Sequence, residues 1–262
     1  MARQALTDNL WEQLQATMAQ HGCYRKDKNR DVMEAILWKL RTGAPWRDIP
    51  EELCPWKTAY NRFNRWSKTG FVGEIFFSLR KEVDTEWVFI DGSYIRCHQH
   101  ASGARRGEDR AIGRSRGGAT TKIHLSCDAD GYPLDFKITG GDVHDSQVAG
   151  ELIDMIGQAD YFIADKGYDS EAIRDKARTH DMVPVIPTRK NATQSNPEFD
   201  SYLYKLRHLV ENMFARLKHF RSIATRYEKL ARNFKSMLYL ACTIIHCKMN
   251  NGTRPSKVTS LL

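Results

Sequence analysis

Three carboxylates in this sequence stand where acidic side chains are costly. Asp91 closes an apolar run that begins at Trp87, and Asp165 closes a second run that begins at Tyr161. Glu211 is a lone acid among basic, aromatic and apolar residues. An aspartate embedded in an apolar run is expensive unless something satisfies it. Carboxylates that are brought together repel each other, and either take up protons or bind cations.

The ligand type indicates which cation these acids would hold. An all-oxygen set favours Mg²⁺ or Mn²⁺. Two such ions about 4 Å apart can stabilise both the attacking and the leaving oxygen of an in-line phosphoryl displacement. We therefore expect Asp91, Asp165 and Glu211 to be catalytic residues and the ligands of two such metal ions. Cys97, His98 and His100 lack the matching second pair that a zinc site needs.

Glu211 also shares a predicted helix, residues 201–219, with three further candidates. At about 100° per residue, Tyr204, Arg207, Glu211 and Lys218 fall within an arc of about 60°. Apolar residues fill the neighbouring arc and would face a core. The pattern predicts a carboxylate flanked by a phenol, a guanidinium and an ammonium. On spacing alone, a solvated charged face accounts for the same pattern.

The net charge of +8 on 262 residues is unevenly placed. Residues 125–200 carry 7 Lys/Arg against 15 Asp/Glu, whereas residues 201–235 carry 9 against 2. Basic segments around an acidic centre suit a polyanion held over a site that also needs cations. No apolar segment reaches the length of a membrane span, and the N-terminal residues lack a signal-peptide pattern. The six cysteines show no regular spacing, which indicates reduced thiols rather than disulfides. We expect a cytoplasmic protein without membrane association.

The elements that position these residues fall into two predicted domains. Residues 1–80 form a small all-α domain with helices at 8–20, 30–42 and about 55–68, in a helix-turn-helix-like order. The last of these helices exposes Lys57, Arg62 and Arg65 in front of an aromatic inner side, as a DNA-recognition helix requires. A helical bundle with a solvated basic face is the alternative.

Residues 86–250 show a different pattern, that of an α/β domain. The order is a strand, a β-hairpin, a helix, a strand, a helix, a strand and then two helices, which predicts a mixed sheet with flanking helices. The hairpin should lie antiparallel beside the first strand. The helix that follows it should have Asp145 or Ser146 as its N-cap. The segment 101–119 is expected to be a mobile basic loop.

Four motifs carry a resemblance to a known family. They are Ile90-Asp-Gly-Ser-Tyr-Ile95, Gly117-Gly-Ala-Thr-Thr-Lys-Ile-His124, Gly140-Gly-Asp-Val-His-Asp145 and Ile163-Ala-Asp-Lys-Gly-Tyr-Asp169. With the spacing of Tyr204, Arg207, Glu211 and Lys218, the chain resembles bacterial insertion-sequence transposases of the DDE type, and most nearly the insertion sequence five family. Residues 30–70 resemble that family's N-terminal DNA-binding region.

The resemblance implies a ribonuclease-H-like catalytic fold with Asp91, Asp165 and Glu211 as its metal-binding triad. It implies that Tyr204, Arg207 and Lys218 contact DNA near the cleaved phosphate, and it adds Lys122 to the DNA-binding residues. The expected partners are double-stranded DNA, at the transposon ends and the target, and a second copy when assembled on DNA. The expected location is the bacterial nucleoid. Only 46 positions separate Asp165 from Glu211, which leaves no room for a large inserted domain.

The resemblance implies a transposase that binds the ends of its insertion sequence and carries out strand cleavage and strand transfer. A nuclease without strand transfer would show the same triad. A transposon-derived DNA-binding regulator is a different class, and lost carboxylates would mark it, whereas all three are present. A structural RNA-binding role would explain the basic loops but leaves the aspartates at the strand ends without a reason.

Overall fold

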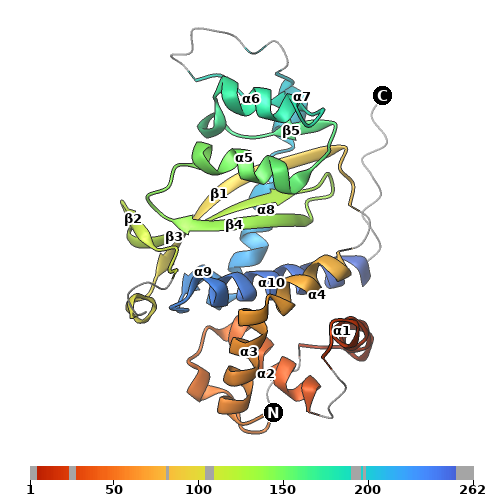
Figure 1. Ribbon diagram of the computed structural model, residues 1–262, viewed down its shortest axis with the longest axis vertical. Coiled ribbons are helices and arrows are strands. Elements are labelled where there is room, and N and C mark those ends of the chain that lie inside the picture. The colour runs from red at the N-terminus through yellow and green to blue at the C-terminus, as the bar shows by residue number, and fades with distance from the viewer. Residues whose placement is uncertain are drawn as a thin grey trace. The chain divides into compact units, whose positions relative to one another are not determined.

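The structure is a computed structural model that describes residues 5–23, 28–80, 83–103, 109–189, 196 and 199–251 (Figure 1). The chain divides into two compact units. We call Met1–Lys81 with Ser236–Leu262 the helical unit, and Glu82–Lys235 the sheet unit. None of the helices in the described ranges is long and apolar enough to cross a membrane.

The helical unit contains the three predicted helices and one more. They are α1 (Asp8–Gln20), α2 (Asn29–Thr42), α3 (Trp56–Thr69) and α4 (Phe71–Leu79). Gly43 ends α2 in the left-handed region at φ 70°, which a glycine adopts without steric cost. The connection from α2 to α3 then runs through the 3₁₀ turn η1 (Trp46–Asp48). This connection is longer than the three- to four-residue turn of a typical helix-turn-helix, and both flanking helices are present.

A C-terminal helix, α10 (Ala231–Asn251), completes the helical unit. It begins in the sheet unit, and its residues from Ser236 onward group with the helical unit. Tyr239 stacks near Phe76 of α4 at 5.4 Å between ring centroids, and a side chain at Gly73 would meet the same tyrosine ring at 3.1 Å. A fragment ending at residue 80 would therefore lack one of the layers on which α4 packs.

The sheet unit is built on β1 (Trp87–Cys97). The strand order is β2-β3-β1-β5-β6, with β4 beside β3 and β7 beside β1. The hairpin β3–β4 is antiparallel and adjacent to β1, whereas β5 and β6 run parallel to β1. The mixed sheet and its order agree with the ribonuclease-H-like expectation. The remaining strands are β2 (Gly113–Ser115), β3 (Gly118–Cys127), β4 (Pro133–Gly140), β5 (Tyr161–Ile163), β6 (Val183–Val185) and β7 (Thr225–Arg226).

Helices cover both faces of this sheet (Figure 1). On one face, α5 (Asp145–Ile156) packs on β3 and β4, and α6 (Glu171–Arg178) packs on α5. On the other face, α8 (His208–Lys218) packs on β1 and β3. Because side chains alternate along a strand, Val88 and Ile90 join the core under α5, and Phe89 and Asp91 point to the face of α8.

Two local expectations were wrong. Residues 201–219 do not form one helix: α7 (Ser201–Lys205) ends at Leu206, and α8 starts after Arg207. At the break the backbone uses bonds of the i to i−3 type, such as Leu209 N–H to the Leu206 carbonyl at 2.9 Å. The N-cap of α5 is His144, whose ring accepts from the Ser146 N–H, and this leaves Asp145 in the first helical turn.

The segment 101–119 is only partly irregular. It contains the end of the 3₁₀ turn η2 (Gln99–Ser102) and the strand β2, which pairs with β3. Residues 104–108 lie outside the described part of the chain. A short helix, α9 (Arg221–Ala224), leads from α8 into β7.

The turn of the β3–β4 hairpin provides a prediction about pH. Asp128 is buried, and burial raises the pKa of its carboxyl to about 7, against about 3.9 in an unfolded chain. Between these values the folded state binds more protons than the unfolded state. The stability contributed by Asp128 is therefore complete below about pH 4 and is lost as the pH rises through 7.

Asp128→Asn keeps an oxygen that can accept from the Tyr132 and Asp130 N–H groups but cannot ionise. We expect this variant to melt at least roughly 2–4 °C above the wild type at pH 8, the shift that about 1 kcal/mol gives in a domain of this size. The difference should shrink at pH 5. Melting curves at the two pH values measure it, and a gap that is larger at pH 5 would contradict the assignment.

Candidate active site

Two of the three predicted acids are brought together by the parallel pairing of β1 and β5. In this register Phe89 is opposite Ile163. Asp91 follows Phe89 by two residues and still lies within β1. Asp165 follows Ile163 by two residues and lies just beyond the end of β5. Equal steps along adjacent parallel strands keep side chains level and on one face. The two carboxylates are close enough for Asp165 to raise the pKa of Asp91.

Each aspartate is also tied to the backbone that follows it. Asp91 Oδ1 accepts from the Gly92 N–H at 2.8 Å, and Asp165 Oδ1 accepts from the Gly167 N–H at 2.7 Å, where it caps the 3₁₀ turn η3 (Lys166–Tyr168). Burial is the largest influence on Asp91 and raises its pKa, although the nearby Arg207 guanidinium opposes this. A carboxyl group with a raised pKa, next to a second carboxyl group, is a site where a cation would bind well.

Arg207 joins the third acid to the first. Its Nη1 lies 2.9 Å from Asp91 Oδ2, and its Nη2 bonds to Glu211 Oε1. The guanidinium is partly buried, and its pKa is raised: burial lowers it, but the charges of Asp91 and Glu211 more than compensate. Glu211 itself is 52% exposed and so remains accessible from solvent. One cation thus already spans the acid from the strand and the acid from the helix.

The carboxylate oxygens of Asp91, Asp165 and Glu211 are the ligand type that a divalent cation prefers, but they do not surround one common point. Within the described residues, no three His, Cys, Asp or Glu side chains lie close enough to hold a metal ion together. The reason is visible in the ion pairs, since Arg207 occupies the space between Asp91 and Glu211. A metal ion held by all three acids would require the guanidinium to leave at least one of them.

Lys218 and Tyr204 lie on the same side of the sheet. Lys218 Nζ donates to Ser93 Oγ at 2.8 Å, and Ser93 is two residues beyond Asp91 on the same face of β1. Tyr204 is close enough for its phenol to influence the Arg207 guanidinium, and its ring lies 5.5 Å from that of Phe199. The four residues predicted to share one helix face therefore lie near Asp91. Tyr204, however, belongs to α7 and not to the helix of Glu211.

Lys122 differs from our expectation of a DNA contact. Its side chain is only 3% exposed, and its ammonium group pairs with Asp145 Oδ2 at 2.5 Å. It also lies over the ring of Tyr94, 4.6 Å from the centroid. A buried ammonium needs a carboxylate partner, so this lysine is an internal residue. Two functional candidates were missed, Asp145 and Tyr168, although both lie within the motifs quoted above.

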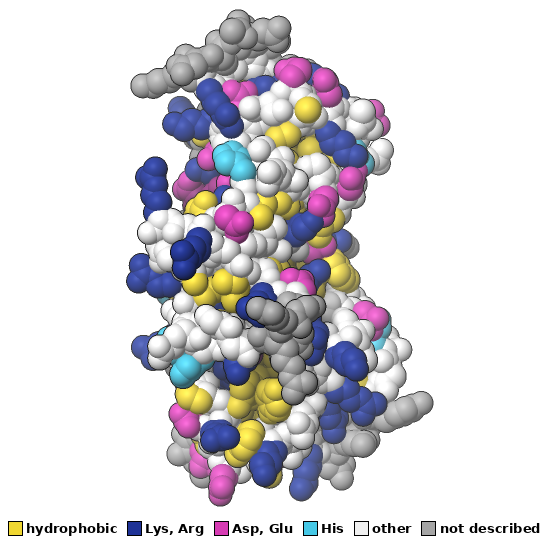
Figure 2. All heavy atoms as spheres, turned by 60° about the vertical axis from the view of Figure 1, so that its left-hand side comes forward, with side chains coloured by type: hydrophobic (Ala, Val, Ile, Leu, Met, Phe, Trp, Pro, Cys, Tyr) yellow, Lys and Arg dark blue, Asp and Glu magenta, His cyan; other side chains and the backbone are white. Residues whose placement is uncertain are grey.

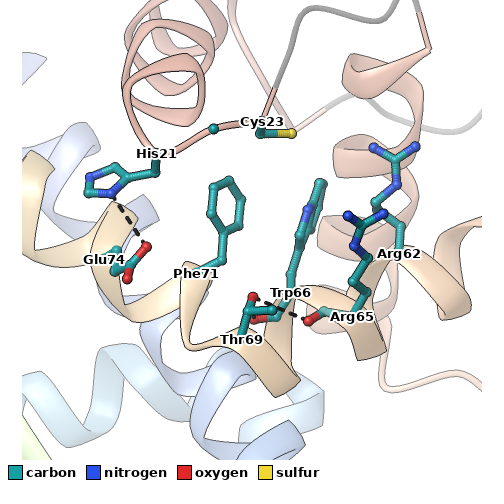
Figure 3. Close-up of a pocket in the computed structure, with 9 residues that line it drawn as sticks. His21, Cys23, Arg62, Arg65, Trp66, Thr69, Phe71 and Glu74 are labelled. Carbon is teal, nitrogen blue, oxygen red and sulfur yellow. Dashed lines mark hydrogen bonds and ion pairs between the residues drawn. The ribbon is translucent and has the colours of Figure 1, made fainter.

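The basic residues of the helical unit include two that line a pocket of about 370 Å³ (Figure 3). Arg62 and Arg65 extend along one side of it, next to Trp66. Arg62 donates to Asn29 Oδ1 at 3.0 Å and lies over the Trp66 ring. Arg65 is exposed and has no ion pair within the described ranges. Lys57 is exposed too, but outside this pocket.

The opposite end of the pocket is closed by an ion pair between His21 and Glu74, at 3.4 Å. The positive charge of the pocket therefore lies on the side of the two arginines, whereas the other side carries the paired His21 and Glu74. This asymmetry suits an anion that enters from the arginine side.

Family models match both parts of the chain. A model described as "Transposase DDE domain" matches residues 84–245, and one described as "Putative transposase of IS4/5 family" matches residues 6–76. The first covers more than half of the chain and includes all three acids.

Relatives give the same assignment. A "Putative transposase for insertion sequence element IS6501" from Brucella ovis is 36% identical over 130 residues, which are 48% of this chain and 97% of that protein. A "Putative transposase for insertion sequence element IS402" from Burkholderia cepacia is 35% identical over 143 residues, 50% of this chain and 64% of that protein. A solved pre-cleavage Mos1 transpososome aligns at 12% identity and a TM-score of 0.29, over 87% of this chain and 80% of that one, too distant to add to the assignment.

The DDE domain is a divalent-metal domain that acts on DNA, which agrees with the oxygen donors of Asp91, Asp165 and Glu211. Sequence motifs, sheet order and family models all point to one class of enzyme. The chain belongs to the DDE transposases of bacterial insertion sequences.

Proposed function

We propose that this transposase cleaves DNA at the ends of its insertion sequence and joins them to target DNA, with Asp91, Asp165 and Glu211 holding two Mg²⁺ or Mn²⁺ ions. The observation that carries the proposal is the Arg207 guanidinium, which joins Asp91 to Glu211 beside a third carboxylate at the same level of the sheet. A group of acids that is held together by a cation is suited to exchange that cation for another.

Arg207 has two roles in this proposal. In the absence of metal and DNA, it neutralises Asp91 and Glu211 and keeps the two acids within reach of each other. The three acids would hold the metal, and the guanidinium would then be free to bind a DNA phosphate, for which its planar fork is well suited. Metal and DNA binding would thus be coupled through one side chain.

When bound, the metal ions would supply Lewis acidity at the attacking and leaving oxygens of the scissile phosphate. The protein's own part is to position that phosphate. Lys218, held at Ser93 two residues from Asp91, lies where an ammonium can bind a flanking phosphate oxygen. Tyr204 lies next to Arg207 and can donate from its hydroxyl to the same backbone. Misplacement of reacting groups by about 1 Å costs on the order of a hundredfold in rate.

The helical unit would recognise the transposon ends. Arg62 is held in place by Asn29 and Trp66, so it loses little freedom when it binds a phosphate, and Arg65 beside it is open to solvent. Figure 2 shows basic side chains spread over the visible surface with acidic ones between them. On this face, charge alone does not mark one groove, and the paired arginines of the pocket are the more specific feature.

Two copies of the chain would act together on DNA, since an insertion sequence has two ends and each sheet unit has one triad. The cytoplasm, at the bacterial nucleoid, is where such an assembly meets its substrate.

The triad is tested by isosteric neutral variants. Asp91→Asn, Asp165→Asn and Glu211→Gln should each lower strand cleavage by about a hundredfold or more, because each removes a metal ligand. Binding to end DNA should stay within about twofold. Asp160→Asn, which neutralises an exposed acid of the same unit, is the matched control. Cleavage and target joining, measured on one labelled end substrate, separate a transposase from a nuclease that cuts without joining. Normal cleavage by Glu211→Gln would exclude this triad.

Arg207→Gln tests the exchange of cations. We expect the DNA-free variant to bind Mn²⁺ up to about fivefold more tightly, because a partly exposed ion pair is worth up to about 1 kcal/mol and the competing guanidinium is gone. Cleavage should nevertheless fall. Lys218→Ala is the control: the ammonium of Lys218 bonds to Ser93 and has no ion pair with an acid among the described residues, so the variant should weaken DNA binding and leave Mn²⁺ affinity unchanged. Titration with Mn²⁺ by electron paramagnetic resonance measures both. Weaker Mn²⁺ binding by Arg207→Gln would refute the exchange.

Arg65→Ala tests end recognition in the full-length chain. Loss of one phosphate contact should weaken binding to end DNA and reduce the slope of log affinity against log salt by about one unit. Lys176→Ala removes one cation from the surface of the sheet unit and makes the same change in net charge. If both variants shift the slope equally, the effect comes from overall charge and Arg65 makes no specific contact.

A further inference from the structure

A buried polar cluster lies behind the catalytic strand, on the face of α5. Its centre is the Asp145 carboxylate, which pairs with the Lys122 ammonium. His124 Nδ1 lies 3.1 Å from Asp145 Oδ1, and the Tyr168 hydroxyl donates to the same oxygen at 3.4 Å. Lys122 is 3% exposed and His124 is fully buried. We call Lys122, His124, Asp145 and Tyr168 the buried cluster.

Charged groups in this position are costly unless they satisfy one another. Burial raises the pKa of Asp145, but the close approach of His124 and the hydrogen bond and charge of Lys122 outweigh it, and the net pKa is lowered. The Asp145 carboxylate is therefore ionised and paired. His124 Nε2 is bonded to Thr139 Oγ1 at 2.8 Å, whereas its Nδ1 approaches Asp145 without the alignment of a hydrogen bond. The cluster joins β3, β4, α5 and the turn after β5.

Gly92 brings the buried cluster against the strand of Asp91. A Cβ atom at this position would lie 2.2 Å from Asp145 Oδ1 and 2.9 Å from Lys122 Cε, distances that no real side chain shows. Only glycine lets the carboxylate touch the β1 backbone, one residue after the first catalytic acid. Because neighbouring residues of a strand point to opposite faces, Asp91 projects toward α8 while Asp145 supports the strand from behind.

Tyr168 connects the same cluster to the second catalytic acid. It follows Asp165 by three residues, at the end of η3, and its ring is fully buried. Burial raises the pKa of its phenol well above the usual value, and the charges of Asp145, Asp91 and Asp165 raise it further. The tyrosine hydroxyl therefore stays protonated and available to donate to Asp145. Through it, the turn that carries Asp165 and the strand that carries Asp91 share one support.

We propose that Lys122 and Asp145 are positioning residues of the transposase, which fix Asp91 and Asp165 relative to each other through Gly92 and Tyr168. This inference rests on the proposed role of the two aspartates. It replaces the expected DNA contact of Lys122 with an internal role, and it assigns a purpose to the Gly140–Asp145 motif. Asp145 itself is not a further metal ligand, because it supports the opposite face of β1.

Two single variants and their combination test this positioning. Asp145→Ala removes the support, and Gly92→Ala pushes it away, so each should slow cleavage by about tenfold to a hundredfold at saturating DNA and Mg²⁺. In the double variant the alanine at position 92 meets no carboxylate, and the flexible end of the Lys122 side chain, no longer held by Asp145, can move away from it. The double variant should therefore cleave no more slowly than Asp145→Ala alone. Asp154→Ala, on the exposed side of the same helix with Lys176 and His180 as partners, is the matched control and should cleave normally.

Hydrogen–deuterium exchange of the DNA-free, full-length chain gives a second measurement that does not depend on activity. Peptides from residues 89–95 should exchange faster in Asp145→Ala than in the wild type, while peptides from residues 133–140 stay protected. A merely structural role would lower the melting temperature and leave both the cleavage rate at saturation and the exchange of residues 89–95 unchanged, and that result would overturn the proposal. Additive losses in the double variant would also overturn it.

A failure of the proposed function and a failure of the positioning role would give different results. If the wild type failed to cleave in Mg²⁺ or Mn²⁺, the proposed function would fail, but the exchange of residues 89–95 would still decide whether the cluster supports β1. Lys122→Met separates the two roles of the lysine. Slower cleavage with unchanged DNA affinity supports positioning, whereas weaker DNA binding with normal exchange would return Lys122 to the DNA-binding residues and refute the proposal.

Discussion

The arrangement of the sheet unit depends on how it manages repulsion between acids. Asp91 is partly buried beside Asp165, and Glu211 approaches from another element; without a cation these groups would push one another apart. Arg207 provides that cation by bonding to the strand acid and the helix acid at once. The docking of α8 on β1 is therefore an electrostatic constraint as well as a packing one, and the apolar side chains of α8, such as Val210 and Met213, fix its depth.

The side chains on the two faces of β1 contact different groups of residues. Toward α8 the strand presents Asp91 and Ser93, which meet Arg207 and Lys218. Toward α5 it presents Gly92 and Tyr94, which meet the buried cluster. The alternation of a strand makes this division automatic. Odd-numbered positions from 91 to 93 therefore point toward α8, and even-numbered positions from 92 to 94 point toward the buried cluster.

Much of this arrangement could be predicted from the sequence, because it depends on local patterns. The apolar runs that end in Asp91 and Asp165 predicted both strands, whereas their parallel pairing and its register are known only from the structure. The break before α8 could not be predicted in this way. No proline or glycine lies near Leu206 and Arg207, so the interruption comes from tertiary packing rather than from a helix-breaking residue.

The burial of individual lysine and arginine side chains could not be predicted from the sequence either. Lys122 and Arg226 lie in basic stretches and were counted toward a DNA-facing charge. Arg226 is fully buried, and its guanidinium donates to the carbonyl groups of Ala111 and Glu228 at 3.1 and 2.9 Å. Burial lowers its pKa to about 10, so it remains charged. A sequence shows how many cations a segment has, but whether each one meets solvent or an internal acceptor is decided by residues far away in the chain.

The path of α10 has a consequence for how the protein is made. Tyr239 packs on Phe76 and over Gly73, so the helical unit is completed by residues that the ribosome adds only after the whole sheet unit. Throughout synthesis of the sheet unit, the nascent chain carries an unfinished helical unit with part of its apolar surface uncovered. A product that terminates before α10 would therefore carry a helical unit whose α4 lacks its Tyr239 contact.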